Sequence, residues 1–234
     1  MLAIIAGSNF HLRWKETGRG KIKTPFGPVE EIRWGELGEM RCFFLPRHGP
    51  DGKVPPHRIN HRAHLFALKD LGVKAIIGVN STGSLRRDLP PGKIVIPHDF
   101  LSPWSILSFF DGEAFHITPS LDEGLREKLI EAAEKARVDF AREGVYVQTL
   151  GPRLETKAEI AMLKTFGHVV GMTMAHEATL ACEIGMPYAS ICSVDNYAHG
   201  LLPEPLSQEE IARRARENAE KINRILEEFE GWES

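Results

Sequence analysis

Residues 75–79 read Ala75-Ile76-Ile77-Gly78-Val79, an unbroken apolar run that leads into the small and polar residues 80–84. Apolar residues at successive positions are typical of a strand that helices cover on both faces. Before this run, apolar residues within 59–67 keep the spacing of one helical face. A helix followed by a doubly covered strand favours an α/β fold.

Five further β-rich runs and two long helical patterns accompany this strand. The runs are Leu2–Ala6, 42–45, 93–97, 145–150 and 188–194. A helical stripe is predicted within residues 119–142, on Leu125, Leu129, Ala132, Ala136 and Phe140. Ser207 and Glu210 predict a capping box at the start of a C-terminal helix. The proline-rich segment 202–205 is predicted to be a loop.

The order of these elements predicts one domain over residues 1–234, with a mixed, mostly parallel central sheet flanked by helices. We find no repeat, low-complexity tract or linker that would divide the chain. A chain of 234 residues is long enough for one large α/β domain with a sizeable core.

Composition narrows the class of protein. The formal net charge of −3 gives no support for binding to nucleic acid or to a membrane surface. The three cysteines, Cys42, Cys182 and Cys192, lie far apart in apolar surroundings, which is typical of free thiols in a reducing compartment. The chain has no signal-peptide pattern at its start and no apolar stretch of 18 residues. A cytoplasmic location is therefore expected.

Two predicted strands end in polar side chains that suit a planar ring. Glu155 follows the run 145–150, and Asn196 follows the run 188–194. Open α/β sheets bind ligands at the carboxyl ends of their strands. A carboxylate and an amide that meet in one pocket can hydrogen-bond one edge of a heterocycle.

Other strand ends carry groups suited to an oxyanion. The Gly7-Ser8 turn offers backbone N–H groups and a hydroxyl, and Arg47-His48 offers a guanidinium and an imidazole. The stretch 79–85 is predicted to form an anion-binding nest of backbone amides at a strand end. Each motif alone also fits an ordinary surface or βα turn.

Further polar residues have equally plain alternatives. Thr173 could give a hydroxyl to phosphate and Met172 could pack on a sugar, although methionines often only fill a core. Glu177 stands among apolar residues, as a structural carboxylate or a catalytic one. His57, His61 and His64 have helical spacing, but no third ligand of suitable spacing lies near, so no metal site is predicted.

In this order, these motifs resemble the trimeric branch of the purine nucleoside phosphorylases, which includes the methylthioadenosine and methylthioinosine phosphorylases. The similarity runs from Leu2 to about Leu226. Its most specific parts are Arg47-His48-Gly49, the stretch 80–85 with 91–96, Gly151-Pro152-Arg153-Leu154-Glu155-Thr156, and Gly171-Met172-Thr173.

The resemblance implies a nucleoside phosphorylase-like fold and a role for each candidate residue. Phosphate contacts are implied for Ser8, Arg47, His48, Ser81 and Thr173. Met172 is implied to lie against the ribose, Leu154 beside the base, Gln208 near the 5′ substituent, and Glu155 with Asn196 at the purine. The implied reaction is phosphorolysis of a purine nucleoside, with inorganic phosphate as co-substrate and no metal or other cofactor. The implied assembly is a homotrimer or a homohexamer built as a dimer of trimers.

Base choice follows from hydrogen-bond chemistry once these roles are assumed. Ionised Glu155 can accept from N1–H of a 6-oxopurine, and the amide of Asn196 can donate to O6 and bridge to N7. Adenine would set its unprotonated N1 against Glu155, with two acceptors opposed. Relatives that prefer adenine carry aspartates in place of Asn196 and Ala198, so inosine- and guanosine-type substrates are expected here.

Some questions stay open at this level. The chain departs from the family pattern at Asn9, Leu154 and His176, where glycine, phenylalanine and proline are usual. A 5′-hydroxyl and a 5′-methylthio substrate are not separable, so methylthioinosine and methylthioadenosine remain alternatives. A protein that binds nucleosides without turnover is a third reading. A dinucleotide-dependent oxidoreductase is disfavoured, because Leu2–Ala6 is not followed by Gly-x-Gly-x-x-Gly.

Overall fold

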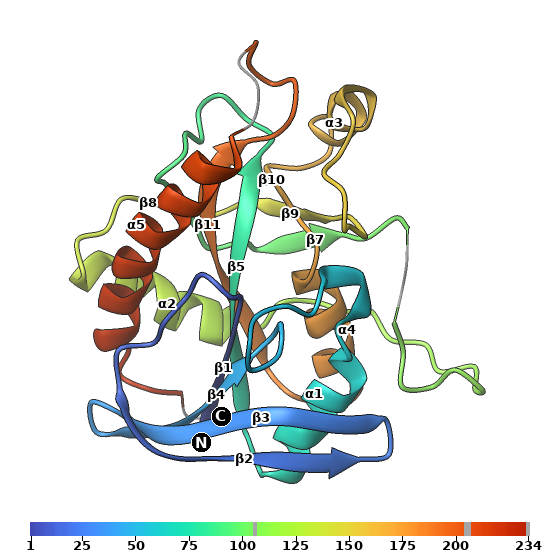
Figure 1. The fold of residues 1–234 in the computed structure, drawn as a ribbon, viewed down its shortest axis with the longest axis vertical. Coiled ribbons are helices and arrows are strands. Elements are labelled where there is room, and N and C mark those ends of the chain that lie inside the picture. Colours follow the sequence, from blue (N-terminus) through green and yellow to red (C-terminus); the bar gives the residue numbers. More distant parts are fainter. Residues whose placement is uncertain (105–106, 204–206, 233–234) are drawn as a thin grey trace.

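The computed structural model describes residues 1–104, 107–203 and 207–232. In this part of the chain, eleven strands form one mixed sheet, and helices pack on both of its faces (Figure 1). The strands are β1 (Leu2–Ala6), β2 (Lys15–Thr24), β3 (Gly27–Leu37), β4 (Met40–Pro46), β5 (Ala75–Ser84), β6 (Ile94–Val95), β7 (Asp99–Leu101), β8 (Phe140–Ala141), β9 (Val145–Gln148), β10 (Val169–Gly171) and β11 (Tyr188–Tyr197). The helices are η1 (Pro56–Arg58), α1 (His61–Asp70), α2 (Glu123–Lys135), α3 (Lys157–Leu163), α4 (Met174–Glu183) and α5 (Gln208–Glu227).

Strand β5 is the axis of the sheet and runs through the middle of the molecule (Figure 1). Its first half pairs in parallel with β1, and it pairs in parallel with β11 along almost its whole length. Its last residues also pair with β10, in the antiparallel direction. The α/β fold with a mixed, mostly parallel sheet is therefore confirmed.

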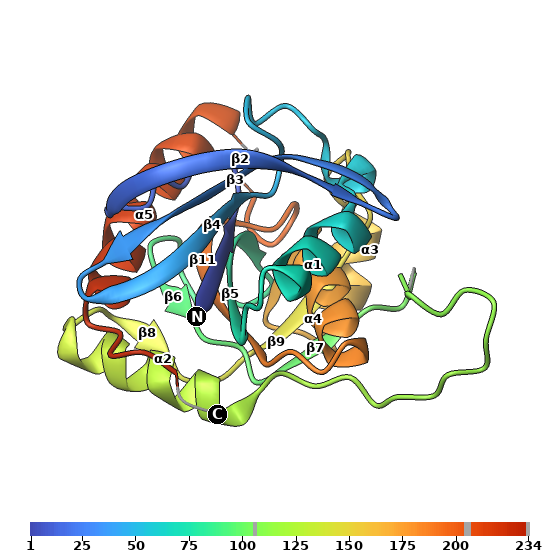
Figure 2. The ribbon, with the colours of Figure 1, turned by 90° about the horizontal axis from the view of Figure 1, so that it is seen from below.

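Helices α2 and α5 cover one face of the sheet, and α1 and α4 cover the other (Figure 2). Successive residues of β1 enter different cores, Ile4 with α2 and α5 and Ile5 with α1 and α4. Ile76 and Ile77 of β5 divide in the same way. The unbroken apolar runs thus arise because each strand is buried on both faces.

Two predictions about these elements are wrong. The helix predicted within residues 119–142 is shorter in the structure, because α2 ends at Lys135. Arg137, just after the helix, adopts a left-handed backbone with φ of 53°, and Phe140 belongs to strand β8. The stretch 79–85 is no nest, because β5 continues to Ser84 between β10 and β11. A polar strand end that is paired on both sides looks like a turn in sequence.

The hairpin of β2 and β3 was not predicted. The residues of β2 alternate between exposed and half-buried positions, whereas β3 also has buried residues such as Val29 and Ile32. Ion pairs such as Lys21 to Glu30 at 2.7 Å join the two strands. Ser207 caps α5 by accepting the N–H of Glu210, which is one half of the predicted capping box. The predicted loop 202–205 lies partly outside the described residues. No helix of the described chain is long and apolar enough to cross a membrane.

Candidate active site

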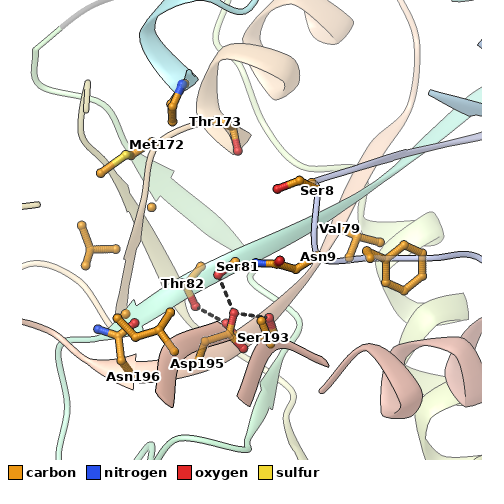
Figure 3. Close-up of a pocket in the computed structure, with 18 of the residues that line it drawn as sticks. Ser8, Asn9, Val79, Ser81, Thr82, Met172, Thr173, Ser193, Asp195 and Asn196 are labelled. Atoms are coloured by element: carbon orange, nitrogen blue, oxygen red, sulfur yellow. Dashed lines mark hydrogen bonds between the residues drawn. The ribbon is translucent and has the colours of Figure 1, made fainter. Parts of the chain in front are cut away.

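A cavity of about 280 Å³ opens where the loops after β1 and β4 meet the last residues of β5 and β11. The structure places all ten sequence-predicted site residues in its lining (Figure 3 shows several). These are Ser8, Arg47, His48, Ser81, Leu154, Glu155, Met172, Thr173, Asn196 and Gln208. Ser8 and Thr173 lie at one end of the view, and Asn196 lies at the other.

Arg47 is held rigidly from behind the cavity. Its Nε and Nη2 donate to Glu177 at 2.5 and 3.1 Å, Nη1 donates to the Val79 carbonyl, and Nη2 also donates to the Ile5 carbonyl. Burial alone would lower the pKa of Arg47, but the carboxylate of Glu177 more than offsets this and raises it. Four of the five N–H groups are thus engaged by described residues, and a hydrogen of Nη1 is left over.

His48 presents an acceptor to the cavity. Its Nδ1 lies 2.7 Å from the Val54 carbonyl, which can only accept, so Nδ1 carries the proton. Burial lowers the pKa of His48, which keeps the ring neutral and leaves a lone pair on Nε2. A side chain at Gly7 would stand 3.8 Å from both this Nε2 and Nη1 of Arg47. This part of the cavity therefore suits an anion that carries one proton, such as hydrogen phosphate.

Two of the predicted phosphate hydroxyls already have partners. Thr173 Oγ1 donates to Asn80 Oδ1 at 2.9 Å, and Ser81 Oγ donates to Asp195 Oδ2. The hydroxyl of Ser8 points toward Thr173 across the cavity (Figure 3). Thr173 also precedes α4, so the positive end of the helix dipole faces this side of the cavity. The geometry favours negative charge here even without a free hydroxyl donor from Ser81.

The opposite end carries the carboxylate and the amide. Glu155 is buried, and its Oε1 accepts the hydroxyl of Thr149 at 2.6 Å. Nδ2 of Asn196 donates to the Tyr197 carbonyl at 2.8 Å, which leaves its second N–H and its Oδ1 for other partners. A Cβ at Gly83 would come within 3.3 Å of that Nδ2, so the glycine makes room for the amide. These groups can bind one edge of a planar ring.

Sequence reasoning missed three residues that hold the lining in place. Thr149 orients Glu155 by donating its hydroxyl to the carboxylate. Asn80 accepts the hydroxyl of Thr173, and Asp195 accepts the hydroxyl of Ser81. Asp195 is almost fully buried; burial raises the pKa of its carboxyl group, and donors from Ser81, Asn218 and Ser193 oppose that rise. The sequence did offer one signal for Asp195, namely a charged residue directly after the apolar run 188–194.

His57, His61 and His64, the three histidines with helical spacing, do not line the cavity. His57 belongs to η1 and His61 begins α1, so they do not share one helix. The ring of His61 packs 5.3 Å from that of His176 and 6.4 Å from that of His64. Among the described residues, no group of three or more His, Cys, Asp or Glu side chains could hold a metal ion.

The cavity thus joins an anion subsite to a subsite for a planar heterocycle, as in enzymes that act on nucleosides and phosphate. Residues 2–229 match the model of the Phosphorylase superfamily, and the chain belongs to this family.

Curated relatives are similar over almost the whole chain. A protein of Archaeoglobus fulgidus named "Probable 6-oxopurine nucleoside phosphorylase" is 43% identical, over 97% of this chain and 95% of its own. The S-methyl-5'-thioadenosine phosphorylase of Hyperthermus butylicus is 39% identical, over 96% of this chain and 85% of its own. A solved methylthioadenosine phosphorylase from Schistosoma mansoni, in complex with adenine, superposes with a TM-score of 0.87 at 30% identity, over 97% of this chain and 89% of that one.

Proposed function

We propose that this protein cleaves 6-oxopurine nucleosides, such as inosine and guanosine, with inorganic phosphate to give the free base and ribose 1-phosphate. It is then a pentosyltransferase that needs no cofactor, since phosphate is itself the second substrate. The observation that carries the proposal is the position of Glu155 and Asn196 in the same cavity as Arg47 and His48. The name of the relative from Archaeoglobus fulgidus supports the same substrate class.

The reaction follows from the two ends of the cavity. A phosphate oxygen attacks C1′ of the ribose, and the bond from C1′ to N9 breaks with its electron pair leaving on the base. Positive charge develops on the sugar, and the phosphate dianion next to it stabilises that charge while acting as the nucleophile. Arg47 donates an N–H to the anion, and Nε2 of neutral His48 accepts a hydrogen bond from the P–OH group of hydrogen phosphate. Catalysis rests on positioning and electrostatics, without a side-chain nucleophile.

The departing base gains a proton at N7 from solvent, which is balanced by the proton that hydrogen phosphate loses as the ribose 1-phosphate dianion forms, and the polar end of the cavity favours the N7-protonated base. Oδ1 of Asn196 can accept from N7–H while its free amide N–H donates to O6. Glu155, oriented by Thr149, accepts from N1–H. Adenine offers no proton at N1, so the oxygen of Glu155 that is not bonded to Thr149 would be left unpaired at a cost of about 1–3 kcal/mol.

A specific observation favours a second candidate, S-methyl-5′-thioinosine. Beside Gln208, helix α5 contributes the apolar residues Ile211 and Ala215 to the cavity lining. An apolar wall suits a methylthio group better than a hydroxyl, which would lose hydrogen bonds to water there. A "Probable S-methyl-5'-thioinosine phosphorylase" of Methanothermobacter thermautotrophicus is 43% identical, over 90% of this chain and 76% of its own.

A substrate panel tests both candidates. Initial rates are measured for inosine, guanosine, methylthioinosine and methylthioadenosine, each with and without phosphate. Phosphate-dependent release of hypoxanthine from inosine supports the first candidate, and a higher kcat/KM for methylthioinosine supports the second. Release that ignores phosphate identifies a hydrolase. Calorimetric binding without any turnover identifies a nucleoside-binding protein and refutes the proposal.

We also propose that the protein assembles as a homotrimer or homohexamer in the cytoplasm. Trp104 and Leu150 are exposed and line a second pocket together with Glu155, and Leu154, next to Glu155 in the chain, is exposed as well. Exposed apolar side chains that gather in this way often belong to an interface between subunits. The segment of residues 107–120 forms a long loop at the edge of the molecule (Figure 2), in which Phe109 packs against Phe26 but Phe115 is exposed. Sedimentation velocity measures the assembly directly; a species of 26.2 kDa at all concentrations would refute it.

A further inference from the structure

We propose that Asp195 is a positioning residue that holds a β-bulge in β11 and thereby turns Asn196 into the base end of the cavity. The inference rests on the proposed function. The register between β11 and β5 passes from Val194 opposite Thr82 to Asn196 opposite Gly83. Residue 195 is therefore the extra residue of the bulge.

The bulge changes which side chains share a face of the strand. In a regular strand, Ser193 and Asp195 would face one side, and Val194 and Asn196 would face the other. Here Ser193, Asp195 and Asn196 all line the cavity, while Val194 packs in the core beside α4. Bulges commonly re-aim a side chain beside an active site. Without this one, the amide of Asn196 would follow Val194 away from the cavity.

The carboxylate of Asp195 ties the bulge to its neighbours on two sides (Figure 3 shows the bonds to the serines). Oδ2 accepts the hydroxyls of Ser81, from β5, and of Ser193, the latter at 3.1 Å. Oδ1 accepts Nδ2 of Asn218, from α5, at 2.8 Å. The same Nδ2 donates to the Val194 carbonyl at 3.0 Å, at the residue before the bulge. Three donors from β5, β11 and α5 thus converge on one carboxylate that is only 1% exposed.

Loss of this carboxylate would act through Asn196. The three donors would be left without their acceptor in a buried place, and the bulge could relax toward a regular pleat. Asn196 packs directly over Gly83, so a small shift of the backbone moves its amide away from N7 and O6. Misplacement of a reacting contact by about 1 Å can cost about 100-fold in rate.

A pair of substrates separates this role from general damage. Inosine must gain a proton at N7 as its base leaves, and that step depends on Asn196. In 7-methylinosine the methyl group occupies N7 and the base carries positive charge, so it departs neutral without a proton. Both nucleosides use the same phosphate and ribose contacts. The ratio of their kcat values therefore reports the contact at N7.

The variants are Asp195→Asn and Asn218→Ala, with Asn223→Ala as the matched control. Asn223 is a buried amide on the same helix, but it bonds to the backbone of His11 and Arg13. We expect Asp195→Asn and Asn218→Ala to lower kcat for inosine about 10- to 100-fold while 7-methylinosine changes less than about threefold. The control should keep the ratio of the intact protein.

Equal losses on both substrates in variants that melt as the unaltered protein does would overturn the inference. If Asp195→Asn does not fold, Asn218→Ala and Ser193→Ala decide the question by the same ratio. Absence of phosphate-dependent cleavage of either nucleoside by the unaltered protein would instead refute the proposed function.

Discussion

The guanidinium of Arg47 and the carboxylate of Glu177 are joined by two hydrogen bonds of 2.5 and 3.1 Å across 130 residues of sequence. Both side chains are essentially buried, and the hydroxyl of Tyr188 donates to the same carboxylate at 2.8 Å. The pair fixes the guanidinium so that its Nη1 edge faces the anion end of the cavity. A residue of α4 outside the cavity lining thereby sets the orientation of a guanidinium that lines the cavity.

Replacement of Glu177 by alanine should destabilise the protein by about 3–5 kcal/mol, because it leaves the buried charge of Arg47 without a partner. The KM for phosphate should rise as the guanidinium loses its anchor. Urea unfolding and phosphate titration measure the two effects. Glu217→Ala, which removes exposed pairs with Arg213 and Arg214, should leave the unfolding midpoint unchanged. A midpoint for Glu177→Ala equal to that control would contradict the assigned ion pair.

Replacement of Asn196 by aspartate should lower kcat/KM for inosine by at least about tenfold, since a carboxylate cannot donate to O6 and leaves a buried contact unpaired. The ratio of adenosine to inosine cleavage should rise, because the new carboxylate can accept from the 6-amino group. Steady-state kinetics with both nucleosides measures this ratio. Asn60→Asp, at the N-cap of α1, is the control and should keep it. Unchanged inosine activity in Asn196→Asp would show that the role assigned to this amide is wrong.

Replacement of Thr149 by valine tests how Glu155 is oriented. The change keeps the shape but removes the hydroxyl that donates to Oε1 of Glu155. We expect kcat/KM for inosine to fall about 3- to 30-fold, and the KM for phosphate to stay constant. Thr165→Val serves as the control, because that hydroxyl donates to the Met162 carbonyl on the surface. A loss confined to phosphate binding would refute the expected role.

Acid should destabilise the protein through His176. Burial lowers the pKa of this ring to about 4, whereas a histidine of the unfolded chain titrates near about 6.5. Between those values the unfolded state binds the extra proton, so stability is complete above about pH 6.5 and falls as the pH falls toward about 4. Over this pH range the free energy of unfolding of His176→Gln should fall by about 3 kcal/mol less than that of the unaltered protein. Urea unfolding at several pH values measures the slope, and a slope unchanged from that of the exposed-site control His116→Gln would contradict the prediction.

Replacement of Gly7 by alanine should weaken phosphate binding with little effect on the fold. The new methyl group would lie 3.8 Å from both Nη1 of Arg47 and Nε2 of His48, an ordinary contact distance that nevertheless fills the anion subsite. The KM for phosphate should rise at least about tenfold, while kcat at saturating phosphate changes little. Gly72→Ala is unsuitable as a control because its φ is 74°. Ser108→Ala can be used instead, because Ser108 bonds Glu183 and does not line the cavity. An unchanged KM for phosphate would show that phosphate does not bind next to Gly7.

Much of the sheet could be predicted because its strands are buried on both faces. The run at 75–79 and the run 188–194 were recognisable as strands, since burial on both faces favours apolar residues at successive positions. The same logic failed where strands are not buried on both faces. The hairpin of β2 and β3 is half exposed and rich in Lys, Arg and Glu, so it resembles a solvated loop in sequence.

The candidate site was predictable as a set of residues but not as a set of contacts. The sequence motifs indicated Ser81, but only the structure shows that its hydroxyl donates a hydrogen bond to Asp195. Asn80 and Thr149 were not singled out, because short polar residues at strand ends are common and their partners lie 93 and 6 positions away. The bulge at residue 195 depends on pairing with β5, which a single strand's sequence does not encode.

The bulge in β11 also constrains how base choice could evolve in this chain. An aspartate at position 196 would stand directly beside the buried carboxylate of Asp195, and two neighbouring carboxylates resist ionising together. A lineage moving toward adenine nucleosides would therefore gain less from that single change than it would beside a neutral residue. Replacing Asp195 first, by a neutral residue that still accepts from Asn218, would remove this charge conflict but would also weaken the bulge that positions residue 196. Either order of the two mutations would therefore pass through an intermediate protein of reduced activity.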